Sequence, residues 1–325
     1  MRSTALVLTL TLAASPASAK ITRYLTGNPG DVSAGPLAGP ALNLGGGGTD
    51  VDAALQAMID LARGCTSCAT TVDVVILRAS GADGYNDYIF AMNGVDSVES
   101  LVITKASEAN SAAVVATVSN AEVVFFAGGD QCNYVTLFKG GALEAAVESV
   151  YARGGSIGGT SAGMAIQGEF IYDGCRGSAT STEILANPFH RRASFTYDYF
   201  SWNDMGDVMT EQHLVTRDRM GRLFGFLARQ IQDGRTPSAL GVAADEVTSV
   251  VVDSSGLATV YGEGNAYFVL ADHFPEVCQP KTPLTYSGYK MWRRSPGQTF
   301  DLRNRPTTPD YTISVTDGVL SGSPY

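Results

Sequence analysis

The sequence has few of the residues that build metal centres or nucleic-acid interfaces. It contains three histidines in 325 residues, so no histidine-rich metal site is expected. Basic residues are also in the minority, with 22 lysines and arginines against 32 aspartates and glutamates, a formal net charge of -10. So acidic a surface is a poor partner for nucleic acid or for an anionic membrane. We therefore expect no metal, no nucleic acid and no membrane as a partner.

The sequence also lacks an apolar run of the roughly 18 residues that a membrane helix requires. One shorter apolar run, residues 5–14, follows Arg2 and precedes "ASA" at residues 17–19. This combination is typical of a secretory signal peptide, which would span residues 1–19 and be cleaved before Lys20. The mature chain is therefore expected to be secreted or periplasmic.

Cysteine is scarce and odd in number. The five positions are Cys65, Cys68, Cys132, Cys175 and Cys278. In an oxidising compartment disulfides are expected, and an odd count leaves at least one thiol without a partner in the chain. Spacing alone does not assign the connectivity. For the first two, a small disulfide-bonded loop after a helix is favoured over a redox pair or half a zinc site, because no second ligand pair follows at zinc spacing.

Short apolar runs alternate with longer amphipathic segments through the first half of the chain. The expected strands span residues 41–44, 72–78, 98–104, 122–127 and 156–158. The expected helices span residues 49–63, 106–118 and 135–152, the first with Thr49 or Asp50 as its cap. This alternation predicts an α/β fold whose central sheet is mainly parallel and covered by helices on both faces.

The second half of the chain has a different pattern of short strands and turns. Residues 247–253, 257–262 and 266–271 predict an antiparallel meander, and a final hairpin is expected with its turn at residues 317–318. No internal repeat or long linker is evident. We therefore expect one α/β domain over residues 20–271, with a β-rich extension over 272–325 packed on the same domain.

The segment "GTSAG" at residues 159–163 has the G-x-S-x-G pattern that in some hydrolases holds a serine on a sharp strand-to-helix turn. In a chain with 36 glycines this pattern alone is weak evidence. However, ligands of parallel sheets bind beyond the carboxyl ends of the strands. Ser161 follows an expected strand, and so does the glycine-rich segment "GGDQ" at residues 128–131. This setting favours Ser161 as a nucleophile.

A serine nucleophile needs a base, usually a histidine that a carboxylate orients. His190 lies beside two arginines, which disfavour the protonation that a base must accept. His273 lies after the meander, just before a proline. His213 lies between an expected strand from Asp207 and a segment with apolar residues at helical spacing. This position favours His213 as the base.

Four stretches of the sequence resemble the cyanophycinase and peptidase E family of serine exopeptidases over about residues 40–270. They are "FFAGGDQ", "GGTSAGMA", "EQHLVTRDRMGRL" and "GVAADE". The resemblance implies a three-layer α/β sandwich related to class I glutamine amidotransferases. It also implies a catalytic serine at Ser161, a histidine at His213 and an acid at Glu246, with Asp245 as the competing choice.

The resemblance further implies contacts with an aspartate-rich substrate. The substrate-binding positions would be Gln131, Gln212, Arg217, Arg219 and Arg222. The alternative for Gln131 is a helix-capping amide, and for the arginines a solvated helix face. Cyanophycinases commonly have Asp-Gln-His-Phe where residues 211–214 are Glu-Gln-His-Leu, so the pocket beside the base is expected to differ in size. An export signal is a second departure, because cyanophycin is an intracellular store.

The chemistry expected from these residues is acyl transfer, with the oxyanion held by the backbone N–H groups of Gly129 and Ala162. It requires no cofactor. The expected reaction is the cleavage of cyanophycin to β-Asp-Arg dipeptides. The alternatives are an aspartyl or isoaspartyl exopeptidase acting on short peptides, and a catalytically silent binding protein on the same fold. The oligomeric state is left open, with a homodimer as one option.

Overall fold

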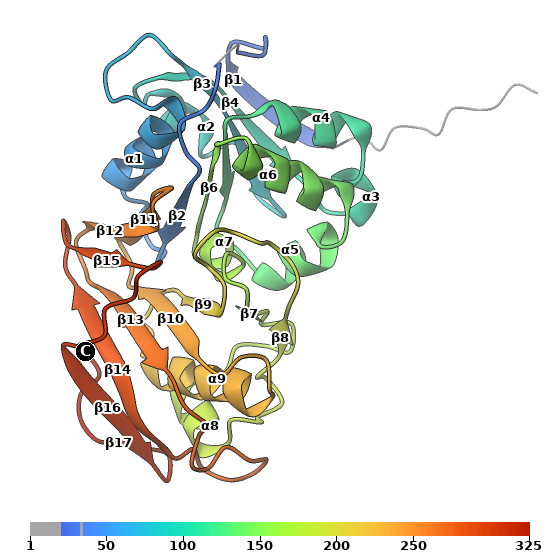
Figure 1. Ribbon diagram of the computed structural model, residues 1–325. Coiled ribbons are helices and arrows are strands. Elements are labelled where there is room, and N and C mark those ends of the chain that lie inside the picture. The colour runs from blue at the N-terminus through green and yellow to red at the C-terminus, as the bar shows by residue number, and fades with distance from the viewer. Residues whose placement is uncertain (1–20, 33–34) are drawn as a thin grey trace, which may run out of the picture.

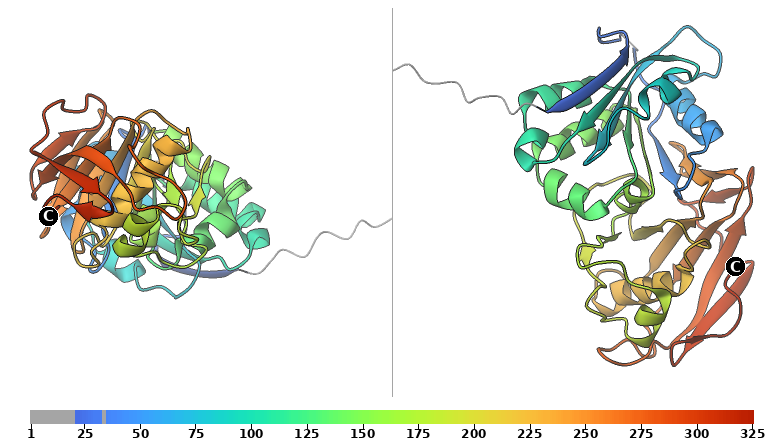
Figure 2. Two further views of the ribbon diagram at one scale, coloured as in Figure 1. Left: turned by 90° about the horizontal axis from the view of Figure 1, so that it is seen from below. Right: turned by 180° about the vertical axis from the view of Figure 1, so that it is seen from behind.

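Two large sheets make up most of the fold, one above the other in Figure 1 and again in the rear view of Figure 2. This computed structural model describes residues 21–32 and 35–325. The predicted signal peptide, residues 1–19, lies outside the described residues. No helix in the described part is long and apolar enough to cross a membrane.

The first sheet has nine strands. In spatial order they are β1 (Thr22–Gly27), β4 (Val95–Val102), β3 (Val72–Arg78), β5 (Val123–Phe126), β6 (Ser156–Thr160), β2 (Ala41–Gly45), β11 (Thr248–Val252), β12 (Leu257–Gly262) and β15 (Thr299–Asp301). The central strands from β4 to β2 are parallel, and antiparallel strands flank them. The α/β fold with a mainly parallel central sheet is therefore confirmed.

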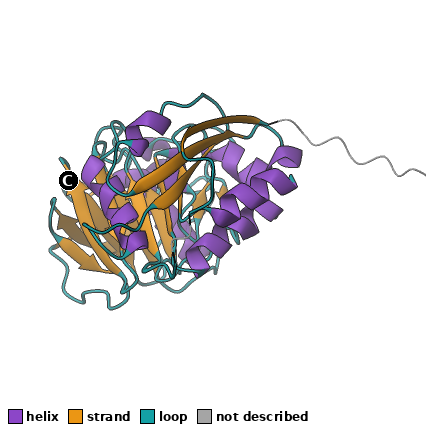
Figure 3. Ribbon diagram, turned by 90° about the horizontal axis from the view of Figure 1, so that it is seen from above, coloured by secondary structure: helices purple, strands orange, loops and turns teal. Residues whose placement is uncertain are grey.

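Helices cover both faces of this sheet, as the view from above shows (Figure 3). On one face lie α1 (Asp52–Arg63) and α2 (Asn86–Phe90); on the other lie α3 (Ala106–Ala109), α4 (Ala112–Asn120), α5 (Gln131–Phe138) and α6 (Ala142–Ala152). Strand β3 accounts for the arrangement, because its side chains alternate in direction. Val74 and Ile76 pack in the cluster beneath α1, whereas Val75 and Leu77 pack in the cluster beneath α4 and α6.

The second sheet has six strands and packs against α8 (Ser181–Ala186) and α9 (Met220–Gln232). In spatial order its strands are β17 (Val319–Leu320), β16 (Tyr311–Thr316), β14 (Tyr286–Arg294), β13 (Ala266–Ala271), β10 (Ala239–Ala244) and β9 (Val208–Glu211). Only β9 and β10 are parallel neighbours. Between the two sheets, β7 (Ile171–Tyr172) pairs with β8 (Phe195–Thr196). Residues 272–325 supply strands to both large sheets.

The predicted meander is wrong at its third strand. Strands β11 and β12 form a hairpin in the first sheet, but β13 pairs with β10 and β14 in the second. The chain therefore crosses between the sheets at residues 263–265. Hydrophobic periodicity predicts that each segment is a strand, but it does not reveal which strands pair with one another.

Two predicted helices are each divided in two. The segment 135–152 holds α5 and α6, separated by Gly140 and Gly141, and Gly140 has a left-handed φ of 73°. The segment 106–118 is interrupted before Ser111, whose hydroxyl accepts a hydrogen bond from an N–H group of α4. The predicted cap of α1 is also wrong. Helix α1 begins after Val51 without a side-chain cap, and Asp50 instead accepts the hydroxyl hydrogen of Tyr85 at 2.7 Å.

The cysteines form two disulfides. Cys65 pairs with Cys68, which confirms the small disulfide-bonded loop after α1, and Cys132 pairs with Cys175. Cys278 is free and buried. Its burial raises the thiol pKa to about 12, so it is uncharged at neutral pH.

Candidate active site

Ser161 lies on a sharp turn between β6 and α7 (Ala162–Ala165). Its φ and ψ of 53° and -113° are unusual for a residue with a side chain. The glycines beside it are needed for packing, because an added Cβ would lie 2.5 Å from the Gly163 carbonyl carbon at Gly159, and 2.1 Å from the Phe126 oxygen at Gly163. The G-x-S-x-G segment therefore forms the turn that its pattern indicates.

A chain of hydrogen bonds connects this serine to a histidine and an acid. The Ser161 Oγ lies 2.7 Å from Nε2 of His213, and the His213 Nδ1 lies 2.6 Å from Oε1 of Glu246. Because a carboxylate only accepts, Nδ1 carries the ring hydrogen and Nε2 is free to accept the serine hydroxyl hydrogen. The competing acid, Asp245, accepts the N–H groups of Val215 and Thr216 instead. It fixes the loop after the histidine.

A run of four glycines after β2, residues 45–48, joins the three parts of this chain. Three successive carbonyls of the run, from residues 45 to 47, accept hydrogen bonds. Their donors are the backbone N–H groups of Ser161, His213 and Val247, at 2.9, 2.8 and 2.9 Å. The glycine run therefore holds the backbone at all three positions.

The same run leaves no room for side chains. An added Cβ at Gly46 would lie 2.0 Å from the Asp245 carbonyl oxygen. One at Gly47, where φ is 103°, would lie 2.2 Å from Cε1 of His213. This role was not predicted from the sequence. The available signal was four consecutive glycines at the exit of a buried strand.

The surroundings of His213 keep its imidazole neutral. Burial lowers the pKa below the usual value of 6.5, and the charges of Arg217 and Arg219 lower it further, while the hydrogen bond to Glu246 opposes them. The ring is 4 % exposed. A neutral imidazole at neutral pH can accept a proton, as a general base must.

A cavity of about 250 Å³ opens beside Ser161 and His213. All five predicted substrate-binding residues line it, together with Gly129, Tyr172 and three residues of the segment 174–178, namely Gly174, Gly177 and Ser178. His190 and His273 are not among its lining residues. The structure thus brings together the residues that the four motifs indicated, from elements far apart in the sequence.

The arginines of the cavity differ in their surroundings. Arg222 is 1 % exposed, and its guanidinium donates two hydrogen bonds to Glu211, at 2.8 and 2.5 Å. It also donates to the Ser178 hydroxyl and the Ala179 carbonyl. Arg222 therefore has protein partners for most of its donors. Arg222 is therefore not part of a solvated helix face, and its guanidinium is not free to bind a substrate carboxylate.

Arg219 and Arg217 have weaker protein partners. The nearest carboxylate oxygen to Arg219 belongs to Glu211 at 3.6 Å, and that carboxylate is already bound to Arg222. Burial lowers the pKa of Arg219 to about 10. The side chain of Arg217 is half exposed and lies 3.7 Å from Glu246. Three arginines and one acid, Asp130, therefore line the cavity, while Glu211 and Glu246 lie beside it.

The two glutamines also lie at the cavity. Gln131 begins α5, but the side chain that caps this helix belongs to Asp130, so the capping alternative for Gln131 is wrong. Its amide donates to the Tyr172 carbonyl at 3.3 Å. Gln212 is 4 % exposed, and its Oε1 has no hydrogen-bond partner among the described residues.

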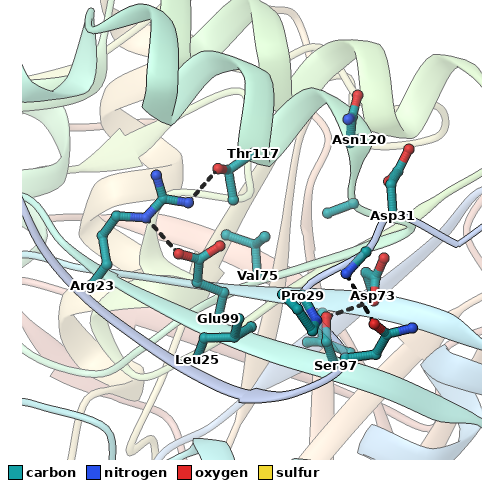
Figure 4. Close-up of a pocket in the computed structure, with 14 residues that line it drawn as sticks. Arg23, Leu25, Pro29, Asp31, Asp73, Val75, Ser97, Glu99, Thr117 and Asn120 are labelled. Atoms are coloured by element: carbon teal, nitrogen blue, oxygen red, sulfur yellow. Dashed lines mark hydrogen bonds and ion pairs between the residues drawn. The ribbon is translucent and has the colours of Figure 1, made fainter.

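A second cavity, of about 170 Å³, lies at β1, β3 and β4, away from Ser161 and His213 (Figure 4). Polar groups of this cavity bond to one another: Arg23 donates to Glu99 at 2.5 Å, and Ser97 donates to Asp73 at 2.5 Å. Its lining residues include no histidine and no cysteine. Within residues 21–32 and 35–325, no group of three or more histidine, cysteine, aspartate or glutamate side chains is arranged to hold a metal ion.

Comparisons with known proteins show what the chain is similar to. No family model matches it. A cyanophycinase of Nostoc sp. is 27 % identical over 227 residues, which are 68 % of this chain and 70 % of that protein. A cyanophycinase of Synechococcus elongatus is 29 % identical over 186 residues, 57 % of this chain and 52 % of that protein.

The fold has a counterpart among solved structures. The crystal structure of a peptidase from an acI-B1 Actinobacterium aligns with a TM-score of 0.53 at 15 % identity, covering 82 % of this chain and 98 % of that one. At this identity the likeness concerns the fold alone. The two cyanophycinases and the four motifs support an assignment of the chain to the cyanophycinase and peptidase E family of peptidases, and the fold agrees with it.

Proposed function

We propose that this peptidase is of the serine type and cleaves amide bonds in aspartate-rich substrates. The observation that carries the proposal is the hydrogen-bonded chain from Ser161 through His213 to Glu246, on a strained turn beside a cavity. In the reaction Ser161 attacks the amide carbonyl while His213 takes its proton. Glu246 holds the imidazolium that forms. Protonated His213 then gives the proton to the leaving amine, and water hydrolyses the acyl-enzyme.

The oxyanion of the tetrahedral intermediate would be bound by the N–H groups of Ala162 and Gly129. Ala162 begins α7, and the first N–H groups of a helix have no partner within it. Gly129 has a φ of 149° and lines the cavity. Its neighbour Gly128 lies close to the nucleophile, since an added Cβ there would be 3.7 Å from the Ser161 Cβ. Two converging N–H donors suit a developing negative charge.

The charge of the cavity supports an anionic substrate. Arg222 and the partly buried Arg219 share the Glu211 carboxylate, so a substrate carboxylate near Arg219 and Arg217 would give these two arginines a further negative partner. The unpartnered Oε1 of Gln212 can accept an N–H group from the same substrate. An aspartyl unit offers both a carboxylate and an N–H group. Because the relatives are cyanophycinases, we propose cyanophycin as the substrate and β-Asp-Arg dipeptides as the products.

A second candidate is an exopeptidase for short aspartyl or isoaspartyl peptides. A cavity of about 250 Å³ is small, which favours a substrate that inserts one residue. In this case the enzyme would act on dipeptides and leave the polymer intact. A silent binding protein is disfavoured, because the 2.7 Å contact between Ser161 and His213 would then have no use.

We also propose that the enzyme is exported. The disulfide between Cys132 and Cys175 supports this, since disulfides persist mainly in oxidising compartments. An exported enzyme would act on polymer released by other cells. Fractionation of the native host and sequencing of the mature N-terminus would test the expected cleavage before Lys20; recovery of uncleaved protein from the cytoplasm would contradict it.

The substrate is tested by incubating the purified protein with cyanophycin and with a panel of aspartyl, β-aspartyl and asparaginyl dipeptides. We expect release of β-Asp-Arg from the polymer, and faster cleavage of aspartyl than of asparaginyl substrates. Ser161→Ala should remove all activity, and labelling by a fluorophosphonate, without lowering Tm. Arg219→Lys keeps the charge but loses the planar fork, so the aspartyl preference should fall. Full activity of Ser161→Ala would overturn the serine mechanism.

A further inference from the structure

The disulfide between Cys132 and Cys175 joins two segments that form walls of the candidate active site. Cys132 is the second residue of α5, directly after Gln131, and Cys175 directly follows Gly174. Their Cα atoms are 4.9 Å apart. Gln131 and Gly174 both line the cavity beside Ser161. Each half of this disulfide is therefore one residue away from a side of the cavity.

The two walls differ in how firmly they are built. The first, residues 129–131, leads into α5, whose Tyr134 and Phe138 are buried in the core of the first sheet. The second, residues 174–178, has left-handed glycines at both Gly174 and Gly177, with φ values of 64° and 89°. Glycine adopts many backbone conformations in the absence of restraint. The second wall therefore depends on its contacts to keep one shape.

Several of those contacts lie on the side of the second wall that faces α9. The Tyr172 hydroxyl donates to the Gly177 carbonyl at 3.0 Å and accepts the Ala179 N–H at 2.8 Å. Arg222 of α9 donates to the Ser178 hydroxyl at 3.2 Å. These bonds attach the wall to the second sheet and its helix. They do not fix its distance from residues 129–131.

Few contacts bridge the cavity from one wall to the other. In the part of the chain that the structure describes, one hydrogen bond connects α5 with residues 171–180, from the Gln131 amide to the Tyr172 carbonyl at 3.3 Å. A bond of this length is weak. The covalent connection through Cys132 and Cys175 is therefore the main restraint on the width of the cavity.

We propose that the Cys132–Cys175 disulfide sets the width of the substrate cavity and thereby the affinity for the acyl part of the substrate. The proposal rests on the proposed function, because it assumes that the substrate binds in this cavity. Both cysteines are positioning residues, since they act through Gln131 and residues 174–178. The triad is held separately by the glycine run at residues 45–48. Loss of the disulfide should therefore weaken binding and leave the chemical step intact.

The test compares two double variants of the full chain. The first, Cys132→Ala with Cys175→Ala, should raise KM about tenfold, because small displacements of binding groups have large kinetic effects. The kcat value and the rate of Ser161 labelling by a small fluorophosphonate should stay within about twofold of the wild type. Hydrogen exchange should increase at residues 174–178.

The matched control is Cys65→Ala with Cys68→Ala. This variant also loses a disulfide, but neither of its cysteines is next in sequence to a residue that lines the cavity. It should leave KM, labelling and exchange at residues 174–178 unchanged. If the first variant does not accumulate as folded protein, the serine pair at the same positions and mild reduction of the folded wild type give the same comparison.

Three results would overturn the proposal. They are an unchanged KM in the first variant, a fall in its kcat and labelling rate as large as its rise in KM, or the same rise in KM in the control. Failure of the proposed function is recognised separately. If the folded wild type is not labelled at Ser161, the serine mechanism is wrong, and the disulfide is then judged from hydrogen exchange. In that case an unchanged rate of hydrogen exchange at residues 174–178 after loss of the disulfide would contradict its proposed role in fixing the cavity wall.

Discussion

Gly47 offers the sharpest test of how the triad is positioned. In Gly47→Ala the new Cβ would lie 2.2 Å from Cε1 of His213, whereas ordinary contacts begin at 3.4 Å, so one group must move by about 1.2 Å. If the imidazole moves away from Ser161 by this amount, their 2.7 Å contact is no longer a hydrogen bond. A misplacement of about 1 Å costs on the order of 100-fold in rate. We therefore expect kcat/KM to fall at least about 100-fold, roughly 3 kcal/mol in the activation free energy.

The backbone of Gly47 adds a cost that must be separated from this clash. Its φ of 103° strains any residue with a side chain, and such strain destabilises a protein by about 1–3 kcal/mol. Gly297→Ala is a matched control, because Gly297 has a φ of 82° and nothing lies within 4 Å of its added Cβ. Both variants should lower Tm, but only Gly47→Ala should lower kcat/KM and the rate of fluorophosphonate labelling. Near wild-type activity in a folded Gly47→Ala would refute the positioning role.

Three further substitutions test the acid, the base and a remote carboxylate. Glu246→Gln should lower kcat by about 10⁴-fold with little change in Tm, as loss of the orienting carboxylate does in serine triads, and a larger effect of Asp245→Asn would assign the acid to Asp245. Arg217→Gln removes a charge that lowers the pKa of His213, so the acid limb of kcat/KM should move to higher pH; an unmoved limb would contradict this influence. Burial raises the pKa of Glu122 to about 7 from 4.5, so its stabilising effect is complete below pH 4.5 and is lost as the pH rises through 7. In Glu122→Gln the free energy of unfolding should no longer fall between pH 5 and pH 8, whereas in the wild type chemical unfolding should show a fall of about 3 kcal/mol at most. An identical pH dependence of the unfolding free energy in both proteins would contradict the assignment.

The parts of the fold that could be predicted from the sequence are those that local pattern determines. Strands β3 and β5 each contain a continuous apolar run with two valines, residues 74–77 and 123–126, because both of their faces are buried under helices. Helix α9 repeats its apolar residues at helical spacing and buries them against the second sheet. The first strand, β1, was missed because its residues are largely exposed or half-buried at the sheet edge. Such a strand has no periodic burial to detect.

The site could be predicted where a residue type is tied to its chemistry. Ser161 and His213 stand in short motifs with few competitors, because a nucleophile and a base must be particular residues. The partner of Arg222 could not be predicted. Its carboxylate, Glu211, lies eleven residues earlier, beyond the spacing of helix pairs, and the two meet only because β9 packs against α9. The glycine run at 45–48 has no side chains to indicate its role.

The residues of the proposed triad are divided between the two sheets. Ser161 follows β6 of the first sheet, whereas His213 follows β9 and Glu246 follows β10 of the second. The parallel register of β9 and β10 pairs Glu211 with Ala243, so the histidine and the acid emerge side by side. Strand β6, which precedes Ser161, has no neighbouring strand among the described residues that leads to His213 or Glu246. The alignment of Ser161 with these two residues therefore depends on the glycine run. Substitutions that loosen the contact between the sheets should therefore separate Ser161 from His213 while the bond from His213 to Glu246 survives.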